Sequence, residues 1–373
     1  MILIITRYFP PSRGGTEAYT FDLARGLAGR GREVVVLAPR AGGDRAFDVG
    51  CGFEVVRFLP GRGRWSRLVG MLKAARRFAA RRPPENVIAT TWSPSGLVAR
   101  WLRFRFSLPY LVIAHGSELY AHRPWNWLRG LVFDGAERVL ANSRFTRRRL
   151  AELGVSPERI VLVPPAVNLT KLAGGRDNSR EWFRGDGPLL LTVTRLSPKK
   201  GVDTVLAALP LVRERAGPVR YLVVGEGEDR PRLERLAREL GVDGAVTFAG
   251  RVSDEELAAA YRLCDLFLLV SREERGGADY EGFGIVLIEA AAAGKPVIAG
   301  RSGGIPEAVE EGASGLLVDP LSPGETAEAI VCLLNDPGRA RRMGETGRRR
   351  VEENFSVEAM AGRVCSLLEE MAQ

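Results

Sequence analysis

Two acidic residues, Glu281 and Glu289, stand eight positions apart, and the second is set inside an otherwise wholly apolar run. A buried carboxylate without a partner is so costly that it must be paired, hydrogen-bonded or neutralised. A structural salt bridge is one explanation. A ligand rich in hydroxyls and phosphates is a better one, because glycine-bearing loops and a spaced pair of cations elsewhere in the chain suit the same partner.

The pair of cations follows the strand predicted at residues 189–194. Arg195 and Lys200 stand five positions apart on a turn that contains Pro198 and closes with Gly201. Two cations on a stiff turn can converge on a diphosphate, although they can also be plain surface charge. Parallel sheets bind ligands at the carboxyl ends of their strands, so the position favours a diphosphate.

Paired glycines, Gly14 and Gly15, join the first predicted strand to a helix opened by Thr16. Glycine lets the backbone approach a ligand closely, and a helix N-terminus offers amide hydrogens to phosphate. The pattern is not G-x-G-x-x-G, so the dinucleotide fingerprint of an oxidoreductase is absent. Alone, such a junction is as often a tight turn as a phosphate site.

Further glycine-bearing loops follow strands of the second half. Gly225 and Gly227 lie in one, Arg251 and Val252 in the next, and residues 302–307 form a third. Each either makes a turn or admits a flat ring or ribose against the backbone. Their shared sheet edge favours binding.

The two acidic residues flank a predicted helix start. Four amide groups there would bind an anion, and the carboxylates of Glu281 and Glu289 can accept hydrogen bonds from sugar hydroxyls and a ribose. The four amides belong to Gly282, Phe283, Gly284 and Ile285.

One histidine, His115, ends the strand predicted at residues 110–114 and precedes Gly116. This position favours a side chain that points into a ligand cleft. A structural hydrogen-bonding role is the alternative.

Short β-branched runs alternate with helical patterns, which is typical of parallel α/β units. Predicted helices include residues 16–28, 67–81 and 144–152. The sequence therefore predicts two doubly wound, Rossmann-like α/β domains facing each other across a cleft. The predicted strands are residues 2–6, 33–38, 53–58, 87–90, 110–114, 138–141 and 160–163, then 189–194, 220–224, 246–249, 266–270, 297–299 and 315–318.

The length of 373 residues fits two domains. We expect an N-terminal domain at residues 1–170, a linker at 171–185 and a C-terminal domain at 186–355. Residues 356–373 have the pattern of an amphipathic helix. Periodicity leaves open whether this helix crosses back to the N-terminal domain.

The composition excludes several classes of protein. The four cysteines lack C-x-x-C spacing and there are only two histidines, so neither a disulfide framework nor a zinc site is expected, and a reducing cytoplasm fits. The first strand has no basic leader, which argues against a secretory signal. No apolar run is long enough to span a membrane, so we expect a soluble or peripheral protein.

Positive charge is concentrated in one region, because residues 57–150 carry 19 Lys and Arg against 4 Asp and Glu. Such a surface attracts anionic lipid, nucleic acid or polyanionic glycan, unless it is merely solvated. Residues 62–78 interleave cations with apolar residues and suit an anionic bilayer. Nucleic acid is disfavoured, because the aromatic residues form no evident stacking platform.

Together these segments resemble the family 4 glycosyltransferases, retaining enzymes of the GT-B fold. The resemblance spans nearly the whole chain, and residues 275–286 are particularly similar to phosphatidylinositol mannosyltransferases. The matching residues are Gly14-Gly15, His115-Gly116, Arg195, Lys200, Glu281, Glu289 and residues 302–307.

The resemblance implies roles at the donor. Arg195 and Lys200 would hold the donor diphosphate and stabilise the leaving group, with the Gly15 amide at the same phosphates. Glu281, with the amides of residues 282–284, would hold the donor hexose.

The remaining roles concern the nucleotide, the reacting carbon and the acceptor. Glu289 would hold the ribose, and His115 would contact the sugar near the reacting carbon. GDP-mannose is the favoured donor, followed by UDP-hexoses, and the acceptor would be lipid-linked or saccharide. No cofactor is implied, and the inner face of the plasma membrane would be the site of action.

Departure of a nucleoside diphosphate builds negative charge that a metal or fixed cations must stabilise. The chain contains no Asp-x-Asp, so the cation route is expected and no metal. No carboxylate can be assigned as a nucleophile near His115, which favours attack from the face of the leaving group. A nucleotide-sugar epimerase on the same fold is the alternative, and it would need acid/base carboxylates at C2 of the sugar.

Overall fold

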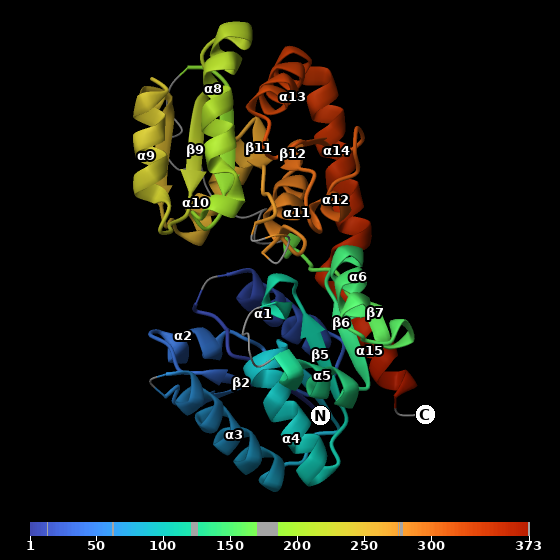
Figure 1. Cartoon of the computed structure of the whole chain (residues 1–373). Coiled ribbons are helices and arrows are strands. Elements are labelled where there is room, and N and C mark those ends of the chain that lie inside the picture. Colours follow the sequence, from blue (N-terminus) through green and yellow to red (C-terminus); the bar gives the residue numbers. More distant parts are fainter. Residues whose placement is uncertain are drawn as a thin grey trace. The chain divides into compact units, whose positions relative to one another are not determined.

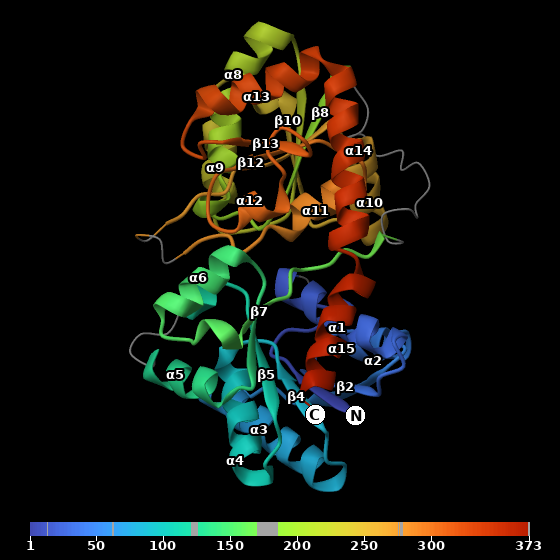
Figure 2. The ribbon, with the colours of Figure 1, turned by 90° about the vertical axis from the view of Figure 1, so that its right-hand side faces the viewer.

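The computed structural model of the chain describes residues 1–12, 14–61, 63–120, 126–169, 186–274, 276 and 279–371. It contains two compact units, Met1–Ala166 with Val357–Gln373, and Val167–Ser356, each built on its own parallel sheet (Figures 1 and 2). The predicted linker at residues 171–185 lies outside the described residues, as do Arg62 and His122.

Unit 1 carries a seven-stranded parallel sheet of order β3-β2-β1-β4-β5-β6-β7. Alternate residues of β1 point to opposite faces, Ile2 and Ile4 into one core and Leu3 and Ile5 into the other. The sheet therefore needs helices on both faces. The strands are β1 (Ile2–Ile5), β2 (Val34–Pro39), β3 (Glu54–Phe58), β4 (Asn86–Ala89), β5 (Tyr110–Ala114), β6 (Arg138–Ala141) and β7 (Ile160–Leu162).

Helices α3 (Arg64–Arg81), α4 (Leu97–Phe106), α5 (Asn126–Gly135) and α6 (Arg144–Glu152) supply the core of one face. On the other face, α1 (Gly15–Gly29) lies beside the C-terminal helix α15 (Val357–Glu370), as Figure 2 shows. The last helix of the chain thus belongs to the first unit. A short helix, α2 (Asp44–Val49), follows β2.

Unit 2 carries a six-stranded parallel sheet of order β10-β9-β8-β11-β12-β13. Helices α8 (Val202–Ala216), α9 (Arg230–Glu239) and α13 (Pro323–Asn335) pack on one face, and α10 (Asp254–Leu263) and α11 (Ile285–Ala292) on the other. Helix α14 (Pro337–Asn354) contributes to both cores, and α12 (Ile305–Ala308) follows β12. The strands are β8 (Leu189–Val193), β9 (Arg220–Val224), β10 (Val246–Gly250), β11 (Leu266–Leu269), β12 (Val297–Gly300) and β13 (Gly315–Val318).

The two predicted doubly wound sheets are confirmed, and each observed strand lies within a residue or so of its predicted ends. In both sheets the strand order reverses beside the first strand, between β1 and β4 and between β8 and β11. Loops that leave two such strands diverge and open a crevice for ligands. Among the described residues, no helix is long and apolar enough to cross a bilayer.

Candidate functional site

The loop after β8 begins with Arg195 and passes through a helical turn, η5 (Pro198–Lys200), into α8. It meets the loop after β11, which leads to α11. The Lys200 ammonium donates a hydrogen bond to Glu281 Oε2, and Lys199 Nζ lies 2.6 Å from Asp279 Oδ1. The structure therefore brings together three predicted residues, Arg195, Lys200 and Glu281, at the strand reversal of unit 2.

Glu281 is held ionised by its neighbours. Burial alone would raise its pKa, but the charge and hydrogen bond of Lys200, helped by Lys199, keep the pKa below its ordinary value of 4.5. Arg195 differs, since its side chain is exposed and has no ion pair with any described residue. One cation of the pair is thus already neutralised, and the other is available to an incoming anion.

A second ion pair fixes this pair of loops and was not predicted. Both Arg272 guanidinium NH2 groups lie 2.9 Å from the Asp203 carboxylate oxygens, and the Arg272 amide donates to Lys199 O at 2.8 Å. Burial opposes ionisation of Asp203, but Arg272 and Arg232 lower its pKa. The two residues are 69 positions apart, so their spacing in the sequence does not indicate the contact.

The glycines of unit 2 explain how the loops come so close. A Cβ at Gly225, where φ is +129°, would lie 1.9 Å from Thr194 O, and one at Gly227 would lie 1.9 Å from Leu196 O. At Gly201 the distance to Val270 O would be 1.8 Å. A side chain at Gly225 or Gly227 would collide with the main chain of the loop after β8. Glycine is therefore required at these two positions because the loops pack closely together.

The loop after β12 also docks on Glu281. The Gly304 amide donates to Glu281 O at 2.9 Å, and a Cβ at Gly303, where φ is +57°, would lie 2.5 Å from the same oxygen. Helix α11 begins at Ile285 behind Gly284, where φ is +87°. The main chain around Glu281 is thus fixed from two sides.

The predicted amide donors at residues 282–285 are not equivalent. Gly282 and Gly284 are buried, and Ile285 is partly buried. The Phe283 side chain is buried and its ring packs on that of Phe355, with centroids 5.4 Å apart. Its side chain therefore serves the core. Arg275, Gly277 and Ala278 of the same segment lie outside the described residues.

Glu289 has a partner that the sequence did not indicate. The buried Tyr261 hydroxyl donates to Glu289 Oε2 at 2.6 Å. Burial and the adjacent carboxylate raise the pKa of Tyr261 well above its usual range, so it stays a donor. This contact between α10 and α11 explains how the carboxylate is tolerated in an apolar run.

Arg251 and Val252 play different parts. The Arg251 side chain is exposed and lies 2.9 Å from Glu226 Oε2, whereas Val252 is buried in the core. The Gly225 amide donates to Gly250 O at 2.8 Å, which joins the loops after β9 and β10. Of these two predicted residues, Arg251 is the one whose side chain is exposed.

Three buried hydroxyls on this edge lack a hydrogen-bond partner among the described residues. They are Ser197, Ser271 and Ser302, one from each of the loops after β8, β11 and β12. Buried polar groups are nearly always satisfied in a folded protein. Ordered water is a common partner of such groups, and their burial places these hydroxyls inside the loops of this edge.

In unit 1, His115 directly follows β5, and its ring lies edge-on to that of Tyr19 at a centroid distance of 5.1 Å. Its Nε2 lies 2.9 Å from Thr90 O, which can only accept, so Nε2 carries the proton and Nδ1 is an acceptor. Burial lowers the pKa of His115, against the effects of Glu118 and Thr90. The imidazole is neutral at pH 7 and is anchored through Nε2, and Nδ1 has no hydrogen-bond partner among the described residues.

Helix α1 starts at Gly15, with Gly14 at its N-cap, and both glycines are exposed. A Cβ at Gly14 would lie 2.4 Å from the Glu17 carboxylate, so that carboxylate packs over the helix start. Burial raises the pKa of Glu17.

The predicted residues thus form two groups, each at the carboxyl edge of its own sheet. Within the described residues, no three His, Cys, Asp or Glu side chains gather as a metal site.

Two family profiles match nearly the whole chain between them. Residues 13–171 match "Glycosyltransferase Family 4", and residues 176–350 match "Glycosyl transferases group 1". The gap between the two matches, residues 172–175, falls outside the described residues and shortly after the point where unit 1 ends at Ala166 and unit 2 begins at Val167.

Similar proteins include a GDP-mannose-dependent alpha-(1-6)-phosphatidylinositol monomannoside mannosyltransferase of Mycobacterium tuberculosis (strain CDC 1551 / Oshkosh), 34% identical over 98% of this chain and 97% of its own. A GDP-mannose-dependent monoacylated alpha-(1-6)-phosphatidylinositol monomannoside mannosyltransferase of Corynebacterium glutamicum is 30% identical over 98% and 97%. Among solved structures, a sucrose-phosphate synthase from Thermosynechococcus elongatus superposes with a TM-score of 0.82, at 25% identity, covering 99% of this chain and 98% of its own.

Proposed function

This chain belongs to the family 4 glycosyltransferases, which have the GT-B fold, and we propose that it transfers mannose from GDP-mannose to a lipid-linked acceptor. The named activity of relatives that match over the full length supports the donor and the class of acceptor. The observation that carries the proposal is the exposed cation Arg195 beside the Lys200–Glu281 ion pair at the strand reversal of unit 2.

In this proposal the donor binds on the loop edge of unit 2. Arg195 and Lys200 hold the diphosphate, and Glu281 with the amides of residues 282–284 holds the mannose hydroxyls. Glu289 holds the ribose, kept in place by its bond from Tyr261.

The neutral imidazole of His115 contributes from unit 1. With Nε2–H bound to Thr90, Nδ1 accepts a hydrogen bond from a sugar hydroxyl near the anomeric carbon, and the Gly15 amide contacts the phosphates.

The acceptor oxygen bonds to the anomeric carbon as the bond to the diphosphate breaks, and a phosphate oxygen takes the acceptor proton. We propose attack from the leaving-group face, so NMR of the product should show retained configuration; an inverted anomer would contradict it.

The donor is tested by incubating the protein with GDP-mannose, UDP-glucose and UDP-galactose, with and without phosphatidylinositol mannoside vesicles. We expect rapid GDP release from GDP-mannose only when lipid is present. EDTA should change the rate less than about twofold, because fixed cations replace a metal in stabilising the leaving diphosphate. Release of UDP instead would correct the donor, and abolition by EDTA would contradict the cation route.

Membrane attachment at the inner face of the plasma membrane is proposed for α3. Trp65 and Val69 on this helix are 61% and 45% exposed, beside the exposed cations Arg67, Lys73 and Arg76, a composition that suits an anionic interface. Co-sedimentation with anionic vesicles should fall steeply between low and high salt, and neutral vesicles should bind weakly. Binding that does not respond to salt, or no binding, would favour a soluble acceptor.

A further inference from the structure

A cavity of about 530 Å³ lies at the carboxyl edge of the sheet of unit 1. It is enclosed by the loops after β1 and β4 and by helices α3 and α4, which lie side by side. This is the strand reversal of the first sheet, where doubly wound folds bind their ligands. The volume falls in the range of small-molecule sites, roughly 300–1,000 Å³.

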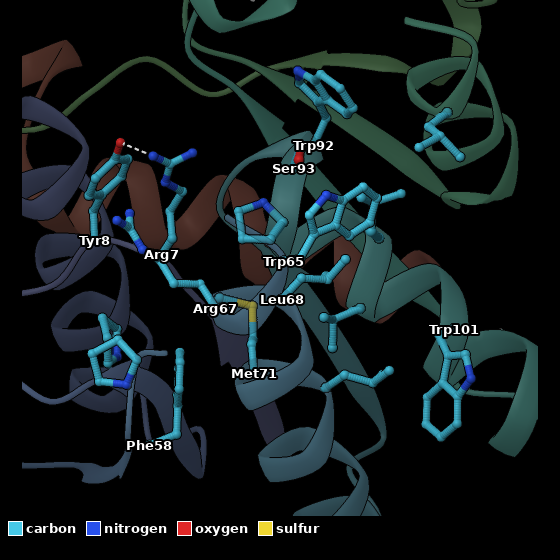
Figure 3. Close-up of a pocket in the computed structure, with 17 residues that line it drawn as sticks. Arg7, Tyr8, Phe58, Trp65, Arg67, Leu68, Met71, Trp92, Ser93 and Trp101 are labelled. Atoms are coloured by element: carbon cyan, nitrogen blue, oxygen red, sulfur yellow. Dashed lines mark hydrogen bonds between the residues drawn. The ribbon is translucent and has the colours of Figure 1, made fainter. Parts of the chain in front are cut away.

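The walls of the cavity are mostly apolar. Met71 and Trp92 are 1% and 2% exposed, and Leu68, Leu97 and Trp101 complete the walls. Figure 3 shows the α3 side chains Leu68 and Met71 directed into this space. A nucleotide or a bare sugar would leave its hydroxyls without partners here, whereas a hydrocarbon chain would not.

Cations also line the cavity. The Arg7 guanidinium lies 4.3 Å from the centroid of the Tyr8 ring and donates to its hydroxyl, as Figure 3 shows. The exposed Arg67 on α3 is a second cation at the same cavity. An apolar space with cations beside it matches a molecule with a hydrocarbon chain and an anionic headgroup.

We propose that this cavity holds one acyl chain of the lipid acceptor, with the acceptor phosphate bound by Arg7 and Arg67. The inference rests on the proposed function in so far as the acceptor is a lipid. The volume of about 530 Å³ has room for roughly eighteen water-sized groups of about 30 Å³ each, which is comparable to the methylenes of one long acyl chain.

The surface around the cavity supports a chain that enters from a bilayer. Among the described residues, eight of the ten large hydrophobic side chains that are exposed belong to unit 1. Trp65 lines the cavity and is itself 61% exposed, and Val69 and Trp127 adjoin the lining residues Leu68 and Leu128. An extracted chain would therefore enter the cavity beside exposed apolar side chains.

The direct test is quenching of tryptophan fluorescence by lysophosphatidylinositol with a brominated acyl chain, kept below its micelle concentration and without donor. Trp65, Trp92 and Trp101 line the cavity, so we expect saturable quenching. With hexanoyl, decanoyl and hexadecanoyl chains, affinity should rise about fourfold per methylene until the cavity is full. The absence of quenching, or equal affinity for short and long chains, would overturn the inference.

Variants that change the cavity in opposite directions separate its role from a general loss of structure. Leu97→Phe should reduce the longest chain that binds well, and Leu68→Ala should increase it. Phe104→Ala, on the same helix as Leu97 but outside the lining and 85% exposed, is the matched control and should leave the chain-length profile unchanged. Partial unfolding cannot produce both shifts, and equal profiles for all three variants would contradict a chain in this cavity.

Two further comparisons show whether the bound acyl chain belongs to the acceptor or to bulk membrane lipid, and whether the cavity proposal and the transferase proposal fail separately. Phosphatidylglycerol lysolipid of the same chain length should quench less, and equal quenching would replace the acceptor with bulk membrane lipid. Transfer that is independent of acyl length, without quenching, would remove the cavity proposal and leave the transferase. Quenching without any mannose transfer would remove the proposed transferase activity and leave the proposal of an acyl chain in the cavity.

Discussion

Replacing Arg195 with alanine is expected to lower kcat for GDP release by about 10²–10³-fold while changing the free energy of unfolding by less than about 0.5 kcal/mol. Arg195 is exposed and has no ion pair among the described residues, so its loss removes no ion pair from that part of the folded chain. Its charge is needed when the diphosphate departs. Steady-state kinetics and thermal unfolding on the same preparation measure the two effects.

Two comparisons sharpen this result. Arg195→Lys should recover only part of kcat, because an ammonium cannot present the two-pronged guanidinium face. Arg215→Ala is the matched control, since Arg215 is an exposed cation in the last turn of α8, at the opposite end of that helix from the loop. Full activity in Arg195→Ala, or an equal loss in Arg215→Ala, would remove Arg195 from the site.

Most of the fold could be predicted because a parallel strand buried on both faces leaves a strong local signal. Strands β5, β6, β9 and β13 have the predicted bounds. The position of α15 could not be predicted, because its apolar stripe would suit either domain and only the contact with α1 decides. Periodicity identifies the buried face of a helix but not its partner.

The site shows the same division between local and long-range information. Arg195, Lys200 and Glu281 follow strands that can be recognised from the local sequence, and this predicted that the three residues lie at one edge of the sheet. The Tyr261–Glu289 bond and the Arg272–Asp203 pair join residues 28 and 69 positions apart. Such partners depend on which segments meet in three dimensions. The sequence offers many other charged and aromatic residues that could have been the partner of each.

The cavity in unit 1 had no signal in the sequence for the same reason. Its lining comes from the carboxyl ends of four strands, β1 to β4, with the loops after them, and from helices α3, α4 and α5, and each tryptophan taken alone resembles a core residue. The glycines gave a partly misleading signal. Gly225 and Gly227 suggested access for a ring or ribose, whereas their Cβ directions are filled by Thr194 O and Leu196 O. Close backbone approach is a correct inference from glycine, but the approaching group can be protein as well as ligand.

Lys200→Ala is expected to lower kcat by about 10³-fold and to reverse the pH dependence of stability that Glu281 contributes. In the native protein the pKa of Glu281 lies below 4.5, so its stabilisation is complete above that pH and is lost as the pH falls through the lowered pKa. Without Lys200, burial is opposed only by Lys199, with Asp279 acting against it. The pKa should then rise above 4.5, and the variant should gain stability on acidification from pH 7 to pH 5.

A second substitution isolates this effect from the other carboxylates. Lys200→Ala should cost about 2 kcal/mol at pH 7, because it leaves a largely buried carboxylate without its ion pair. Glu281→Gln in the same background removes that charge, so it should restore most of the stability and abolish the added pH dependence. It should not restore kcat, since the cation and the carboxylate are both gone. Recovery of activity together with stability would mean that the Lys200–Glu281 pair only holds the loops together, and chemistry would have to be assigned to other residues of the site.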